Sequence, residues 1–234
     1  MTDAFESFRP LTRPTAEEPL KGLTVLVIED SRYASEALRL MCLRSGARIR
    51  RADCLASARR HLSTYRPSVT IVDLGLPDGS GLDLLHRLNT HQPRLPVLLA
   101  TSGDPSLEPA ARAAGAQGFL SKPLASLAAF QRTVIAALPR HAHPPSPVPV
   151  DAVITPDPVA LREDLAQADS ALSGAVAAAR LDYIAQFLAG IGRSTLDRDL
   201  EEAAAGLRGL PAAEATRRVA AVRHLVSARL RKGA

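Results

Sequence analysis

The sequence predicts an α/β domain, a doubly wound parallel sheet with helices on both faces, followed by a small all-α helical domain. Five short apolar segments alternate with amphipathic helical segments between residues 22 and 138. Apolar runs such as VLVI and TIV lack polar alternation, which is typical of strands buried on both faces. After a proline-rich segment, residues 159–234 show helical periodicity only.

The composition indicates what kind of core the protein has and which cellular compartment it occupies. Hydrophobic residues make up 46% of the chain and aromatic residues only 3%, so the core is expected to consist of Ala, Leu and Val. Cys42 and Cys54 fall in predicted helices without metal-ligand spacing, which indicates reduced thiols. No apolar leader segment and no apolar run of the ~20 residues of a membrane span are present. We expect a soluble, cytoplasmic protein with no membrane partner.

The first domain accounts for residues 22–138, and residues 1–21 are expected to be a disordered tail because they are polar, proline-containing and aperiodic. The predicted strands are TVLVIE (24–29), ARIRRA (47–52), VTIVD (69–73), PVLLAT (96–101) and GFLSK (118–122). The predicted helices are Ser31–Ser45, Cys54–Thr64, Gly81–Asn89, Ser106–Ala114 and Leu124–Leu138. The Gly-rich stretch LPDGSG predicts a compact turn after the third strand.

Residues 139–158 are expected to be a semi-extended linker because they hold seven prolines. Beyond the linker, a stripe of apolar residues with a spacing of three to four runs continuously from Leu161 to Ile191. A second helix is expected over Thr195–Leu207, and Pro211 opens a third that reaches Arg231. Residues 159–234 are therefore predicted to form an all-α output or interaction domain.

Polar residues end the strands of the first domain: Glu29 and Asp30, Asp73, Thr101 and Lys122. The carboxyl edge of a doubly wound sheet is where ligands gather, so these side chains are expected to meet there. Adjacent like charges at the end of a buried strand are unfavourable without a cation, and three carboxylates suit Mg²⁺. A carboxylate nucleophile, a divalent cation, a lysine and a hydroxyl together indicate phosphoryl transfer onto an aspartate.

The motifs LVIEDS, VTIVDLGLPDGSGLDLL, PVLLATSGD and GFLSKP occur in this order and strand context. Over residues 22–138 the sequence resembles the receiver domain of two-component response regulators. The resemblance implies a flavodoxin-like five-stranded sheet with the order 2-1-3-4-5. The departures are small: Glu29 stands where Asp is usual, and Ser102 follows Thr101 where Ala is usual.

The resemblance assigns roles to the residues of these motifs. Asp73 is implied to be the phosphoacceptor, and Mg²⁺ is implied to bind Glu29, Asp30, Asp73 and the backbone carbonyl of Gly75. Thr101 and Lys122 are implied to contact the new phosphate. Two further residues are implied to belong to the switch: the aromatic Phe119 and Pro123, which follows Lys122 through a cis bond in this family.

The resemblance also implies partners. A sensor histidine kinase or a histidine phosphotransferase would donate the phosphoryl group, and no separate catalytic output is expected. The alternative is a degenerate receiver that works without phosphorylation, although such a domain usually lacks one of these residues. A basic cluster near the second strand is either a solvated face or a docking patch for an acidic partner or nucleic acid: Arg44, Arg48, Arg50, Arg51, Arg59 and Arg60.

The helical half leaves two outputs open. Residues 151–234 hold equal numbers of acidic and basic residues, so the formal net charge of +5 comes from residues 1–150, and this favours a protein-interaction or dimerisation bundle. The basic last helix supports the alternative, a DNA-binding transcriptional regulator. The segment around Gln186, Ala189 and Gly190 weakly resembles a histidine phosphotransfer helix in which glutamine replaces the histidine and alanine the lysine. Such a bundle would bind partners without carrying phosphate.

Overall fold

The computed structural model describes residues 13–143, 152–174, 177–210 and 212–232. The chain divides into two compact units. The first unit comprises residues 1–30 and 37–155, and the second comprises residues 31–36 and 156–234. Within the described ranges, no helix combines the length and the hydropathy that a membrane span needs.

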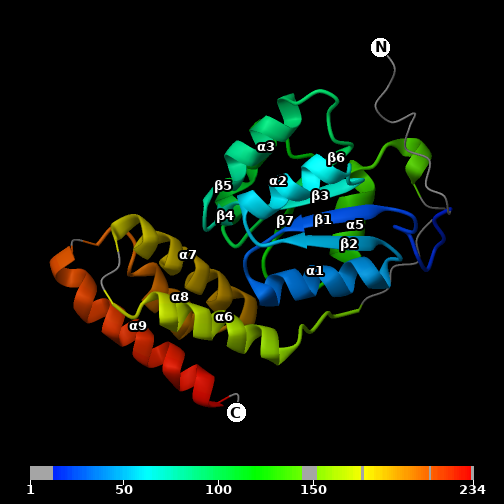
Figure 1. Ribbon diagram of the computed structural model, residues 1–234. Coiled ribbons are helices and arrows are strands. Elements are labelled where there is room, and N and C mark those ends of the chain that lie inside the picture. Colours follow the sequence, from blue (N-terminus) through cyan, green and yellow to red (C-terminus); the bar gives the residue numbers. More distant parts are fainter. Residues whose placement is uncertain (1–12, 144–151, 175–176, 211, 233–234) are drawn as a thin grey trace. The chain divides into compact units, whose positions relative to one another are not determined.

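A five-stranded parallel sheet forms the centre of the first unit (Figure 1). Its strands are β1 (Thr24–Ile28), β2 (Arg48–Ala52), β3 (Val69–Asp73), β6 (Val97–Ser102) and β7 (Gly118–Ser121). The strand order β2-β1-β3-β6-β7 confirms the predicted flavodoxin-like fold class. A small hairpin of β4 (Gly75–Leu76) and β5 (Gly79–Ser80) occupies the predicted Gly-rich turn.

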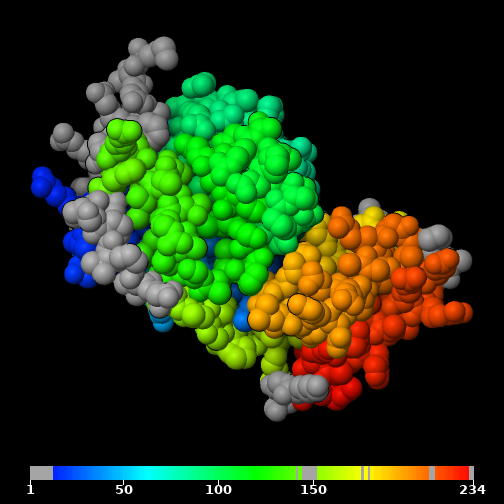
Figure 2. Space-filling view, turned by 180° about the vertical axis from the view of Figure 1, so that it is seen from behind, coloured from blue at the N-terminus to red at the C-terminus, as the bar shows by residue number. Residues whose placement is uncertain are grey.

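Helices cover both faces of this sheet. They are α1 (Arg32–Arg44), α2 (Leu55–Thr64), α3 (Gly81–Thr90), α4 (Glu108–Ala113) and α5 (Leu127–Ala137), with short 3₁₀ turns at Pro105–Leu107 and Arg140–Ala142. One core cluster joins Val25 and Val27 of β1 to α1 and α5, and a second joins Leu26 and Ile28 to α2, α3 and α4. Alternate residues of one strand thus supply both cores, which explains its uninterrupted apolar sequence. The green surface in Figure 2 belongs mainly to the segment that contains β6, β7 and α5.

The segment before β1 differs from the predicted disordered tail. Leu20 is fully buried in the core beside α1 and α5, and its backbone N–H donates to the carbonyl of Ser45 at 2.8 Å. The expectation of disorder up to residue 21 is therefore wrong for this end of the tail, because an apolar side chain fixes it to the core. Residues 1–12 of the predicted tail lie outside the described residues.

Residues 139–143 and 152–155 of the predicted linker pack on the first unit. Ala142 and Ile154 are buried in the same core cluster. The backbone N–H of Ile154 donates to the carbonyl of Ala125 at 2.8 Å, and that of Leu127 donates to Ala152 at 3.2 Å. Residues 139–143 and 152–155 thus belong to the first unit and do not act as a free linker, because Ala142 and Ile154 bury their apolar side chains in its core. Residues 144–151 of the predicted linker lie outside the described residues.

The second unit is helical where it is described. It contains α6 (Pro158–Ala171), α7 (Ala178–Thr195), α8 (Arg198–Ala205) and α9 (Ala212–Lys232), together with the first turn of α1. Leu and Ala side chains of α6, α7 and α8 pack with Val222 and Val226 of α9 in one core. The all-α prediction is confirmed for the described residues.

Two helix boundaries of this unit differ from the prediction. The apolar stripe is not one helix, because α6 ends before Gly174, which has a left-handed φ of 116°. The second expected helix begins only at Arg198, because Leu196 adopts a left-handed φ of 58° and Asp197 caps α8. Gly192 permits the tight turn between α7 and α8: a Cβ there would lie 2.7 Å from the backbone nitrogen of Glu201.

Candidate functional site

Three carboxylates meet at the carboxyl edge of the sheet. Glu29 and Asp30 directly follow β1, and Asp73 is the last residue of the neighbouring strand β3. One carboxylate oxygen from each of the three lies within 4.8 Å of the others. All three residues are buried or nearly so. Parallel strands that end at the same edge therefore bring together groups that are 44 positions apart in the sequence.

Lys122 lies between two of these carboxylates. Its Nζ is 2.7 Å from Oε2 of Glu29 and 3.0 Å from Oδ2 of Asp73. The exposed fraction is 8% for the lysine side chain, 0% for Glu29 and 9% for Asp73, so water screens these ion pairs little. Lys122 follows β7 and is joined to Pro123 by a cis peptide bond, as the resemblance implied.

The cluster contains more negative charge than Lys122 compensates. Burial raises the pKa of Glu29 well above its ordinary value, and the charge of Asp73 raises it further, against the opposing effect of Lys122. Burial alone would lower the pKa of Lys122, but the charges of Asp73 and Glu29 outweigh burial and raise it. The lysine is therefore held as a cation. An excess of closely spaced carboxylate oxygens is the arrangement that a hard divalent cation such as Mg²⁺ stabilises.

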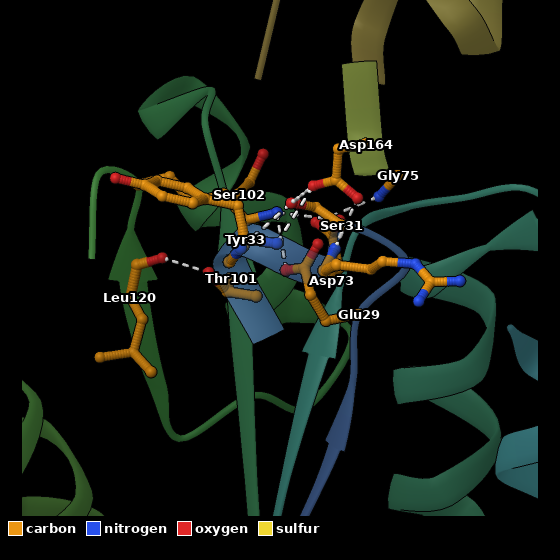
Figure 3. Close-up of polar contacts among 12 residues, drawn as sticks. Glu29, Ser31, Tyr33, Asp73, Gly75, Thr101, Ser102, Leu120 and Asp164 are labelled. Atoms are coloured by element: carbon orange, nitrogen blue, oxygen red, sulfur yellow. Dashed lines mark hydrogen bonds and ion pairs between the residues drawn. The ribbon is translucent and has the colours of Figure 1, made fainter. Parts of the chain in front are cut away.

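The remaining predicted residues surround this cluster. Thr101 is fully buried on β6 in register with Asp73, and its Oγ1 donates to the carbonyl of Leu120 at 2.9 Å (Figure 3). The backbone N–H of Gly75 donates to Oδ1 of Asp73 at 3.4 Å, which places Gly75 beside the carboxylate. Phe119 on β7 is half-buried against the core cluster that includes α4. The predicted carboxylates, Gly75, Thr101 and Lys122 thus lie at this edge, and Phe119 packs in the adjoining core. The individual roles of all the predicted residues stay predictions.

A glycine keeps the loop after β3 close to the strand. A Cβ at Gly81, the first residue of α3, would lie 2.0 Å from the backbone oxygen of Asp73. No side chain fits in that space. The N-terminus of α3 can therefore approach the strand end that carries the predicted phosphoacceptor only because residue 81 is glycine.

Sequence reasoning missed an acidic residue of the second unit. The carboxylate of Asp164 on α6 accepts three hydrogen bonds from the start of α1 (Figure 3). The donors are Oγ of Ser31 at 2.8 Å and the backbone N–H groups of Arg32 at 2.9 Å and Tyr33 at 3.1 Å. Oγ of Ser31 in turn accepts from the N–H of Ala34 at 3.1 Å. Asp164 and Ser31 together satisfy the first three N–H groups of α1, which otherwise have no partner within a helix.

A sequence signal for Asp164 existed. It interrupts the apolar stripe formed by Leu161, Leu165 and Ala168, so its helical position faces the core. Its side chain is fully buried, and burial raises its pKa while the hydrogen bonds from Arg32, Tyr33 and Ser31 lower it. A charged residue on an apolar stripe is rarely buried without partners. The position of Asp164 on the stripe therefore indicates a buried polar contact, but the donors of that contact cannot be inferred from the sequence.

Comparison with known proteins agrees with this geometry. Residues 25–133 match the family described as the response regulator receiver domain. Residues 25–133 are a response regulator receiver domain. The relatives include TcrX of Mycobacterium tuberculosis, 37% identical over 102 residues, and the KDP operon transcriptional regulatory protein KdpE of Escherichia coli, 32% identical over 126 residues. These alignments cover 43% and 54% of this chain and 44% and 56% of the relatives, so the chain spans about half the length of the curated relatives it matches.

A solved structure is also similar to the receiver domain. It is a response regulator protein from Burkholderia pseudomallei with a phosphorylated aspartic acid, a calcium ion and citrate. The sequence identity is 28%, the alignment covers 51% of this chain and 68% of that one, and the TM-score is 0.43. The similarity to a histidine phosphotransfer helix stays a prediction. In the structure Gln186 is half-buried and Ala189 is buried in the helical core.

Proposed function

We propose that the protein is a response regulator of a two-component phosphorelay, phosphorylated on Asp73. The observation that supports this function best is the cluster of three carboxylates with Lys122 between Glu29 and Asp73. Glu29, Asp30, Asp73 and the carbonyl of Gly75 would hold Mg²⁺. The bound ion would supply positive charge to the oxygens of the incoming phosphoryl group.

The chemistry then follows from the side chains of the receiver. An oxygen of the Asp73 carboxylate attacks the phosphorus of a phosphohistidine on a sensor kinase or phosphotransferase, and the phosphorus–nitrogen bond breaks as the acyl phosphate forms. Lys122 already lies 3.0 Å from Oδ2 of Asp73, so its ammonium is placed to pair with a phosphate oxygen. The protein contributes position and charge, which are the main requirements of phosphoryl transfer.

The hydroxyl of Thr101 would change its hydrogen-bond partner when Asp73 is phosphorylated. Its hydroxyl donates to the carbonyl of Leu120 and must leave that acceptor to donate to a phosphate on Asp73. Leu120 would lose a buried hydrogen bond, and its neighbour Phe119 would repack. The added charge of about −2 thereby changes the surface around β6 and β7.

For the output, we favour a helical protein-interaction or dimerisation unit. Two of the five arginines of α9 form ion pairs inside the second unit: Arg223 pairs with Asp169 at 3.0 Å, and Arg229 pairs with Asp197 at 2.8 Å. Paired arginines are less available to DNA phosphates. The contact of Asp164 with the first turn of α1 adds a route for the signal, because Ser31 directly follows Asp30 in the chain.

The second candidate output is DNA binding, with the protein acting as a transcriptional regulator. It is favoured by the printed names of relatives such as KdpE, which is a transcriptional regulatory protein. A titration of labelled duplex DNA with the full-length protein at two salt concentrations separates the two outputs. Tight binding that weakens steeply with salt would support DNA binding, whereas no binding at low salt would support the interaction unit.

The phosphorelay proposal is tested with a small phosphodonor. Wild-type protein should gain one phosphoryl group in the presence of Mg²⁺, and chelation of the metal should suppress the gain. Asp73→Asn protein should gain none, while Asp83→Asn, which changes an exposed carboxylate on α3, should behave as wild type. Equal modification of wild-type and Asp73→Asn protein would contradict the proposal.

A further inference from the structure

A hollow in the receiver domain lies away from the carboxylate cluster. It has a volume of about 390 Å³ and is lined by Thr24, Arg48, Arg50, Tyr65 and Arg66. Thr24 and Arg48 are the first residues of β1 and β2, whereas the carboxylates follow the last residues of their strands. Because the sheet is parallel, the hollow lies at its amino-terminal edge and the carboxylates lie at the opposite edge. We call this site the arginine hollow.

The strand geometry explains why two arginines share this hollow. Arg48 and Arg50 are two positions apart on β2, so their side chains leave the same face of the sheet. Thr24 is the β1 partner of Arg48 in the strand register. β2 is an edge strand, which leaves the arginines open to solvent on one side. Part of the basic cluster recognised in the sequence is thereby concentrated in a concave site.

The positive charges of the arginine hollow have no acidic partner among the residues that the structure describes. No carboxylate lines the hollow, and none of its three guanidinium groups forms an ion pair in that part of the chain. Nη1 of Arg50 donates to the carbonyl of Ile49 at 3.0 Å, which supplies no counter-charge. Three neighbouring cations without counter-charge repel one another, and a bound anion would relieve that repulsion.

Two lining residues are held in place. Nη2 of Arg66 lies 2.8 Å from the carbonyl of Arg94 and donates to it, which fixes this side chain on the loop before β6. Tyr65 is half-buried, and its hydroxyl lies 3.1 Å from Nδ1 of His61. Tyr65 and Arg50 both line the hollow, and the charge of Arg50 opposes the rise in the pKa of Tyr65 that burial causes. The hollow therefore presents an oriented phenol ring beside its cations.

We propose that the arginine hollow binds a small phosphate-bearing anion. Guanidinium groups match phosphate oxygens in charge and in the spacing of their N–H donors. The ring of Tyr65 offers a surface for a planar base, and the volume lies in the range of small-molecule sites. A concave site of this size favours a free phosphorylated molecule over the backbone of a duplex.

The test is a calorimetric titration of the full-length Asp73→Asn protein with ATP and, separately, with pyrophosphate, at two salt concentrations and with EDTA present. The background substitution and the chelator exclude phosphorylation and metal-dependent binding at the carboxylate cluster. Binding is expected to weaken with salt, because charge drives it. Preference for ATP would assign the site to a nucleotide, and equal binding would assign it to an inorganic phosphate anion.

Two double variants locate the binding. Arg48→Thr with Arg50→Thr should weaken ATP binding by about tenfold or more, because two charge-assisted contacts are lost. Arg59→Ala with Arg60→Ala removes the same charge from exposed positions of α2 that do not line the hollow. This control should change the affinity by less than about twofold, since exposed charges separated by water act weakly.

The outcomes that overturn the proposal are distinct. They are the absence of binding by both anions at millimolar concentration, equal weakening by the two double variants, or a duplex oligonucleotide that binds more tightly than ATP and displaces it. Arg50→Lys is the control for a folding defect, because lysine keeps the positive charge but lacks the paired N–H donors of the guanidinium. It should retain the wild-type melting temperature and still weaken ATP binding by about threefold.

Discussion

Replacement of Asp164 by alanine should lower the free energy of unfolding of the second unit. The substitution removes three hydrogen bonds to a fully buried carboxylate and leaves two helix N-terminal N–H groups without their acceptor. Three such bonds at about 1–1.5 kcal/mol each, less roughly 1 kcal/mol for the relieved burial of a charge, give a loss of about 3 kcal/mol. The acid at a helix N-terminus also complements the helix dipole.

Denaturant unfolding and hydrogen exchange of the full-length protein measure this loss. The amides of Arg32 and Tyr33 should exchange faster in Asp164→Ala than in wild type. Glu163→Ala is the matched control: its carboxylate is the adjacent one, and it pairs with Arg32 at 3.0 Å between exposed side chains. The control should lose less than about 1 kcal/mol. Equal stability of the two variants, with unchanged exchange at the start of α1, would show that Asp164 does not stabilise this helix end.

The remaining predictions concern three other contacts. Lys122→Ala removes the cation that pairs with the carboxylates of the cluster, so thermal unfolding should show a loss of roughly 3–5 kcal/mol in the free energy of unfolding. Added Mg²⁺ should partly restore this stability, and no response to Mg²⁺ would count against the metal site. Arg229→Ala breaks the pair with Asp197 and should cost about 1–2 kcal/mol in urea unfolding, against no measurable change for the exposed Arg217→Ala. Burial raises the pKa of Cys42 to about 12, so at pH 8.5 iodoacetamide should modify the native protein at this thiol no faster than the protein unfolds.

The sequence predicted the sheet well because its signals are local. Each strand is an apolar run, each is followed by a helix, and parallel connection of such units leaves few alternatives. The polar ends of the strands then predicted that Glu29, Asp30, Asp73 and Lys122 would meet, because the carboxyl ends of parallel strands share one edge. Only their distances and the degree of burial required the structure.

Other features depended on contacts between distant residues. Leu20 and Ile154 lie in segments whose prolines and polar residues indicated disorder or a linker. Both segments are fixed by the burial of these side chains in the core cluster of the first unit, which depends on residues far away in the sequence. The ion pairs of Arg229 could not be predicted, because a basic helix has the same sequence whether its charges face solvent or the acids of a neighbouring helix. Asp164 was visible as an anomaly on an apolar stripe, but its donors lie more than 130 positions earlier in the chain.

The most direct test of the central claim is to locate the phosphoryl group. Full-length protein would be incubated with acetyl phosphate and Mg²⁺, the acyl phosphate would be reduced with borohydride, and the digest would be sequenced by mass spectrometry. We expect homoserine at position 73 in wild-type protein, and none at that position when Mg²⁺ is chelated. Unmodified Asp73 together with a modified residue elsewhere would contradict this expectation.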